Sequence, residues 1–191
     1  MKNKIGIALL AMLGFVFILG SCKKETPPKG LYIGKPYLDG VIAYILQRGD
    51  PGYVDSVPHG LIAAPYDQSA GIQWCNGASA YTKTNATDTA LGAGMLNTQR
   101  ILQSQHPGSY AAELCAKLAL GDSGGWYLPS LDELDKLYIN QAAIGGFAAD
   151  YYWSSSEDTV TEAWTIYFPS GFEDNSYKDW TGGRVRAVRS F

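Results

Sequence analysis

The sequence predicts an α+β fold with an antiparallel sheet, because strand and helix patterns are segregated along the chain. Strand-like segments come first, helical patterns follow, and strand-like segments return after residue 150. This order favours α+β over the regularly alternating units that build a parallel sheet. The abundance of glycine (22 residues) and tyrosine (13 residues) is typical of short strands, tight turns and long ordered loops.

The first strand signals lie in the N-terminal half of the predicted domain. Residues 38–46 are rich in β-branched and aromatic side chains and predict a mostly buried strand. The apolar residues 61–64 predict a second strand, and residues 72–74 a third. Between Asn76 and Gly94 the chain is polar and rich in threonine, so we expect an ordered loop there.

Helical patterns occupy the middle of the chain. Asn97 is placed to cap a helix over residues 98–105, and Ser109 to cap a second helix that ends near Gly121. The clearest local signal is the capping box formed by Ser130 and Glu133, which predicts a third helix to about residue 140. Strands are then expected at residues 151–154, 163–168 and 184–191.

The N-terminal segment predicts export and lipidation. Lysines precede an apolar run shorter than the roughly 20 residues that span a membrane. The run ends in Leu-Gly-Ser-Cys, which resembles the bacterial lipobox. We therefore expect residues 1–21 to be a signal peptide, Cys22 to carry lipid, and residues 22–34 to be a flexible tether to the membrane, in the outer membrane or at the cell surface. A transmembrane anchor with a free cysteine is the alternative, and it would keep the protein at the membrane too.

Charge and cysteine content bound the partners and the cross-links. Removal of residues 1–21 takes away two of the 15 basic residues and leaves 18 acidic ones, so no nucleic-acid partner is expected. Cys75 and Cys115 could form a disulfide in an exported protein. A buried free thiol is the alternative, because Cys115 falls on an amphipathic helix pattern.

Several sequence blocks, taken in order, are similar to one known family. They are residues 39–46, 59–64, 125–134, 152–157, 163–164 and 185–189. They resemble the DUF1566 family, named for the C-terminal domain of the Legionella collagen-like adhesin and similar to the FISUMP surface domains. The resemblance covers residues 35–191 as one domain.

The resemblance implies a C-type-lectin-like architecture, in which a small twisted antiparallel sheet lies beside two or three helices and long ordered loops. It implies cell-surface binding or adhesion, with glycans as the leading ligand class, and it is compatible with a homo-oligomer. Calcium-dependent lectins of the wider fold carry Glu-Pro-Asn or Gln-Pro-Asp followed by Trp-Asn-Asp, and this chain has none of these motifs. We therefore expect no metal and no other cofactor.

Charged residues within the family-like blocks predict internal ion pairs. Arg186 and Arg189 alternate with apolar residues in an expected strand, so each needs an acidic partner. Glu133 or Glu157 could supply it through a bidentate contact. A ligand site built from these charges is the alternative.

The candidate ligand surface lies in the polar stretch at residues 173–181, which we expect to be an exposed loop. Sugar rings present C–H faces and hydroxyl groups, and a flat aromatic ring beside polar side chains suits both. The candidate residues are Asp174, Asn175, Tyr177, Lys178 and Trp180. The alternative is a hydrated loop with its tryptophan packed back on the domain.

The sequence favours binding over catalysis. Its only histidines, His59 and His106, lie at a strand entry and in a turn, and no nucleophile motif is present. We therefore expect no catalytic residues. The alternatives are an envelope lipoprotein whose partner is another protein and a polysaccharide hydrolase that uses two carboxylates.

Overall fold

The computed structural model describes residues 30–77, 82–121 and 124–191. The predicted signal peptide, the predicted lipid site Cys22 and the first part of the predicted tether lie outside these ranges. Within them, no helix has both the length and the apolar character needed to cross a membrane.

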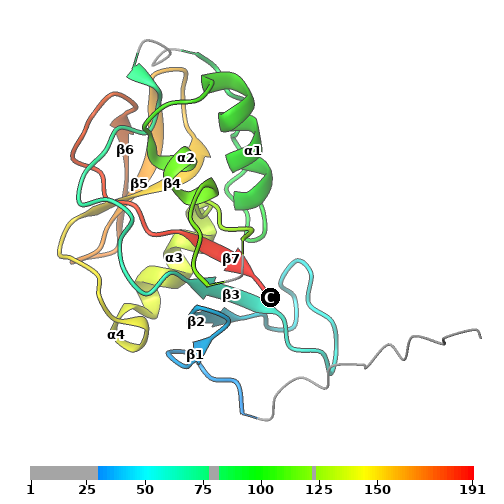
Figure 1. The fold of residues 1–191 in the computed structure, drawn as a ribbon. Coiled ribbons are helices and arrows are strands. Elements are labelled where there is room, and N and C mark those ends of the chain that lie inside the picture. Colours follow the sequence, from blue (N-terminus) through cyan, green and yellow to red (C-terminus); the bar gives the residue numbers. More distant parts are fainter. Residues whose placement is uncertain (1–29, 78–81, 122–123) are drawn as a thin grey trace, which may run out of the picture.

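The described chain folds into two small antiparallel sheets with helices packed against them, which confirms the α+β class (Figure 1). The first sheet has the order β1 (Pro36–Tyr37), β2 (Gly40–Ile45), β3 (Gly60–Ala63) and β7 (Val188–Ser190). The second has the order β4 (Tyr151–Glu157), β5 (Glu162–Tyr167) and β6 (Phe172–Tyr177). The single sheet that the sequence predicted is therefore divided in two.

The segment that leads into β7 connects the two sheets. Arg184 forms a parallel bridge with Tyr152 of β4, and four residues later Val188 pairs with Ala63 of β3. Because only the end of the predicted strand 184–191 pairs within the first sheet, β7 is short. The same stretch of chain thereby belongs to both halves of the fold.

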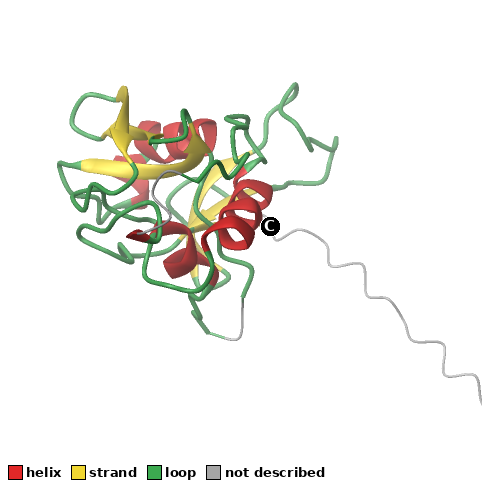
Figure 2. Ribbon diagram, turned by 90° about the horizontal axis from the view of Figure 1, so that it is seen from above, coloured by secondary structure: helices red, strands yellow, loops and turns green. Residues whose placement is uncertain are grey.

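The helices are α1 (Gly94–Gln105), α2 (Ala111–Ala116), α3 (Leu131–Ile139) and α4 (Gln141–Ile144). Helix α3 begins with the predicted capping box, because Ser130 accepts from the Glu133 amide while the Glu133 side chain accepts from the Ser130 amide. It packs against strands of both sheets, so it lies between them (Figure 1). Figure 2 shows the domain from above, with helices packed against the strands. The best local signal in the sequence thus marks the central helix.

The predicted starts of the other two helices are wrong. Asn97 lies inside α1, and its side-chain amide donates to the Asp88 carbonyl at 2.6 Å instead of capping. Ser109 provides no cap either, because α2 begins after Tyr110 without a side-chain hydrogen bond. The helix ends at Ala116, well before Gly121.

Two strand predictions are also wrong. Residues 72–74 form no strand, because their amides bond irregularly to the chain that leads to β7, as Ile72 does to the Gly183 carbonyl. Residues 172–177, expected to be mostly loop, form β6 and pair with β5 along its whole length. The sheet β4–β5–β6 therefore ends in a polar edge strand.

Two hydrophobic clusters fill the fold. One surrounds Trp74 and Trp153, and the other surrounds Leu134 and Phe168 beneath α3. Every member of both clusters lies at or after Tyr37. A fragment of residues 30–191 therefore carries the complete core and both sheets.

The predicted disulfide is absent from this core, because Cys75 and Cys115 are both free and buried. The Cys75 thiol instead donates to the Lys178 carbonyl at 3.2 Å. Burial raises the pKa of the Cys115 thiol, so it stays protonated. The alternative reading of these cysteines, as ordinary buried thiols, is the one that the structure supports.

Replacement of Ser130 by alanine removes the capping box and the bond that the Ser130 hydroxyl donates to the Ala90 carbonyl at 2.8 Å. We expect a loss of about 2 kcal/mol in the free energy of unfolding, at the upper end for a cap, measured by urea denaturation of the 30–191 fragment. Ser109→Ala is the matched control and should stay within about 0.5 kcal/mol. An equal loss of unfolding free energy in Ser130→Ala and Ser109→Ala would contradict the assigned capping box at the start of α3.

Candidate functional site

The five residues predicted to form one ligand surface are divided by the structure. In β6 successive side chains point to opposite faces of the sheet, so Asp174 lies on one face while Asn175 and Tyr177 lie on the other. Lys178 is buried, with an exposed fraction of 1 %. Trp180 is 37 % exposed and lies just beyond the strand. The prediction that the five residues form one surface is therefore wrong. Asp174 and Trp180 remain on one face of the sheet.

Lys178 forms the most deeply buried ion pair among the described residues. Its ammonium lies 2.6 Å from the Glu157 carboxylate, donates to the Val160 carbonyl at 2.8 Å, and sits over the Trp74 ring. The predicted ion-pair role of Glu157 is therefore confirmed in kind, but its partner is a lysine rather than an arginine.

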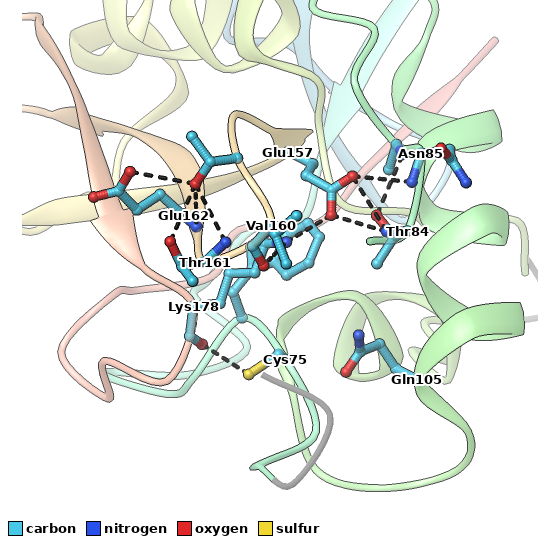
Figure 3. Close-up of polar contacts among 12 residues, drawn as sticks. Cys75, Thr84, Asn85, Gln105, Glu157, Val160, Thr161, Glu162 and Lys178 are labelled. Atoms are coloured by element: carbon cyan, nitrogen blue, oxygen red, sulfur yellow. Dashed lines mark hydrogen bonds and ion pairs between the residues drawn. The ribbon is translucent and has the colours of Figure 1, made fainter. Parts of the chain in front are cut away.

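The Glu157 carboxylate also anchors the long loop before α1. It accepts hydrogen bonds from the backbone amides of Thr84 at 2.9 Å and Asn85 at 2.9 Å. Figure 3 shows Glu157 between this loop and Lys178. One buried carboxylate thus joins β4, the segment after β6 and the loop.

Arg186 pairs with an acid that the sequence analysis missed. Its Nε donates to the Asp67 carboxylate at 2.8 Å, and its other nitrogens donate to backbone carbonyls, including that of Gly146 at 2.6 Å. The guanidinium also stacks over Phe147 at 4.1 Å. The predicted pairing of Arg186 with Glu133 or Glu157 is wrong, because those carboxylates are engaged elsewhere.

Arg189 has no acidic partner among the described residues. It donates to the carbonyls of Gly124 at 3.3 Å and Leu38 at 2.9 Å, and it lies over the Trp126 ring. The predicted ion pair of Arg189 is therefore wrong. Backbone carbonyls and an aromatic face stabilise this charge instead.

Glu133 pairs with no arginine either. Its carboxylate accepts from the amides of Ser130 at 2.8 Å and Gly92 at 3.1 Å and from the Tyr127 hydroxyl at 3.2 Å. Burial raises the pKa of Glu133, and these hydrogen bonds oppose that shift. The residue is an internal acceptor, and its predicted ion-pair role is wrong.

Four aromatic side chains gather on one face of the second sheet, where Phe172 and Trp180 are exposed and Tyr151 and Tyr167 are half-buried. We call these four residues the aromatic platform. Tyr151, Tyr167 and Phe172 come from β4, β5 and β6 and lie directly opposite one another in register. The Tyr151 and Tyr167 rings lie 4.7 Å apart, and Trp180 meets Tyr151 edge-on at 5.9 Å. Phe172 is 59 % exposed.

Asp174 completes this face. It lies opposite Thr165 on the same side of the sheet as Phe172, and its side chain is half-buried. A carboxylate acceptor thus stands beside exposed rings. The sequence analysis did not name Tyr151, Tyr167 or Phe172, and the signal that could have found them is their cross-strand register.

No three histidine, cysteine, aspartate or glutamate side chains in the described ranges are placed to hold a metal ion. What the second sheet offers to a ligand is therefore rings and hydrogen-bonding groups.

The described chain is thus an α+β domain that gathers four aromatic side chains on one face of its second sheet. Residues 64–189 match the family model of the Lcl C-terminal domain, the C-terminal domain of the Legionella collagen-like protein. Because the match covers more than half of the chain, the chain belongs to this family. Membership indicates a surface-exposed, adhesin-like domain. None of the curated proteins compared with the chain matches it.

Removal of the Lys178 charge leaves Glu157 buried without its cation. We expect Lys178→Met to lower the free energy of unfolding by about 3–5 kcal/mol. The double variant Glu157→Gln, Lys178→Met should lose less than the sum of the single changes, because neither charge is then stranded. Urea denaturation of the 30–191 fragment measures both.

Lys83→Met serves as the control, because Lys83 is exposed and its replacement should change stability by less than about 0.5 kcal/mol. A Lys178 variant as stable as this control would show that Lys178 is free for a ligand.

Proposed function

We propose that the protein is a lipid-anchored cell-surface binding module of C-type-lectin-like architecture, and that its ligand is a glycan held on the aromatic platform. The observation that carries the proposal is the set of four neighbouring aromatic side chains, two exposed and two half-buried, on the same face as Asp174. Sugar rings stack their C–H faces on aromatic rings while their hydroxyl groups donate to carboxylates. The platform combines both kinds of contact.

The Trp180 and Tyr151 rings pack against their neighbours without any ligand, which supports a binding role. Trp180 packs edge-on against Tyr151 and also against the buried Trp153, at 5.7 Å. Gly182 lies so close to the indole that any side chain there would collide with it. Little conformational entropy is then lost on binding, because the side chains are already ordered.

The internal hydrogen bonds of the buried carboxylates Glu133 and Glu157 support ligand binding rather than hydrolysis. Glu133 and Glu157, which lie in the family-like blocks, are both buried and surrounded by hydrogen-bond donors inside the fold. Neither is offered to a substrate. The proposed protein therefore recognises its ligand without changing it.

The proposed anchor rests on the sequence at residues 1–34. We propose that residues 1–21 are a signal peptide, that lipid is attached to Cys22, and that residues 22–34 tether the domain of residues 35–191 to the membrane. Family membership supports a surface position. Stable anchoring by lipid needs more than one acyl chain, which a lipidated N-terminal cysteine provides.

The anchor is tested by labelling bacteria that express the full chain with radioactive palmitate. We expect the wild type and Cys75→Ser to be labelled equally and Cys22→Ser to carry no label. Cys75→Ser is the control because it also removes one thiol. Label that persists in Cys22→Ser would rule out the proposed site.

The ligand is tested on a glycan array with the 30–191 fragment. We expect Trp180→Ala to weaken binding about tenfold or more, because it removes the most polarisable ring of the platform. Tyr177→Ala is the matched control: Tyr177 is 62 % exposed but lies on the opposite face of β6, so its loss should leave binding unchanged. Absence of glycan binding, or equal binding by Trp180→Ala, would defeat the proposal.

A further inference from the structure

A pocket lies on the first sheet, away from the aromatic platform. It has a volume of about 300 Å³ and lies between the β2–β3 loop, the segment before α1 and the end of β7. It shares no lining residue with the platform. Its volume is at the lower end of the range for small-molecule sites.

The side chains that line this pocket are mainly apolar. They include Leu46, Leu61, Leu91 and Phe191, and no Asp, Glu, Lys or Arg side chain is among them. Such a lining favours a ligand with a compact apolar body, because a polar surface would lose its hydration there.

The β2–β3 loop forms one wall and is fixed at its base. The Asp50 carboxylate accepts from the Tyr44 hydroxyl at 2.7 Å and from the Gln47 amide at 2.7 Å. Burial and the bond to Asp50 raise the pKa of Tyr44 to about 12, so this bond persists at neutral pH. A neighbouring hollow of about 480 Å³ that reaches α1 shares four lining residues with the pocket: Pro51, Gly52, Leu91 and Gly92.

A chain of hydrogen bonds decides whether the Ser190 hydroxyl can donate to a ligand or accept from it. Every group that reaches the Glu133 carboxylate is a donor, so the Tyr127 hydroxyl donates to it at 3.2 Å. The Tyr127 oxygen lies 3.0 Å from Ser190 Oγ and must then accept the Ser190 proton. Ser190 lines the pocket, and its Oγ is left with a lone pair that can accept a hydrogen bond.

His59 also lines the pocket. Its Nδ1 lies 3.2 Å from the main-chain oxygen of Phe191, which can only accept, so Nδ1 is the donor in this contact. The acceptor at Ser190 therefore calls for a donor on the ligand.

We propose that this pocket is a binding site for a small alcohol or phenol, whose hydroxyl group donates to Ser190 Oγ while its apolar body fills the space between Leu46, Leu91 and Phe191. The site is separate from glycan recognition and does not depend on it. Phenol and benzene are suitable probes, because they share a ring and differ by the hydroxyl group.

The test is a titration of the ¹⁵N-labelled 30–191 fragment with each probe, followed by NMR at the amides of Gly60, Gly92 and Ser190. In the wild type we expect phenol to bind about fivefold more tightly than benzene, the effect of one neutral hydrogen bond. In Ser190→Ala the two affinities should become equal. Ser109→Ala, the same change at an exposed site that caps nothing, should keep the preference.

Two further variants test the location. Leu46 is half-exposed at the rim, so Leu46→Trp should fill the pocket and weaken the binding of both phenol and benzene at least about tenfold. Trp180→Ala should leave both affinities unchanged. If Leu46→Trp does not fold, Ser190→Ala decides alone. The proposal is overturned if phenol causes no saturable shifts up to its solubility limit, or if the preference for phenol survives in Ser190→Ala.

Discussion

An ammonium group that leaves water for a protein core loses several kcal/mol of hydration, and Lys178 recovers it from the Glu157 carboxylate and the Val160 carbonyl. The rest of the second sheet depends on this contact. Glu157 holds the loop at Thr84, so the ion pair joins three segments far apart in sequence. Because Lys178 is fixed, the chain two residues later places Trp180 against the sheet. The buried Lys178 ammonium, which no ligand can reach, thereby positions the exposed Trp180 ring.

The other internal charges follow the same pattern. Arg186 lies in the segment that connects the sheets and is held by Asp67 and backbone carbonyls, while Glu133 fixes the start of α3. These charged residues stand out in the family-like blocks, yet they stabilise the fold from inside. The surface proposed for glycan recognition is formed by aromatic rings and one carboxylate. This division explains how an adhesin-like domain can have buried charges and a weakly charged platform.

The sequence predicted the parts of the fold that local interactions determine. Helix α3 was predictable because its capping box lies within four residues, and the α+β class followed from the order of the patterns. Strand β6 was missed because its edge position lets polar side chains occupy both faces, so no apolar alternation marks it. Lys178 was taken as exposed because its sequence neighbours are polar. Its partner lies 21 residues away, and that of Arg186 lies 119 residues away, so neither pairing could be seen in local sequence.

The central claim is that a glycan binds on the aromatic platform while the buried charges behind it stay in place. The most direct measurement is NMR of the indole N–H signals of the five tryptophans of the chain, followed while the 30–191 fragment is titrated with a glycan that it binds. Three of them, Trp74, Trp126 and Trp153, are buried, and Trp180 is exposed. We predict that the Trp180 signal shifts with saturation and that the Trp74 and Trp126 signals stay unchanged. A saturating titration that leaves the Trp180 signal unmoved would contradict the claim.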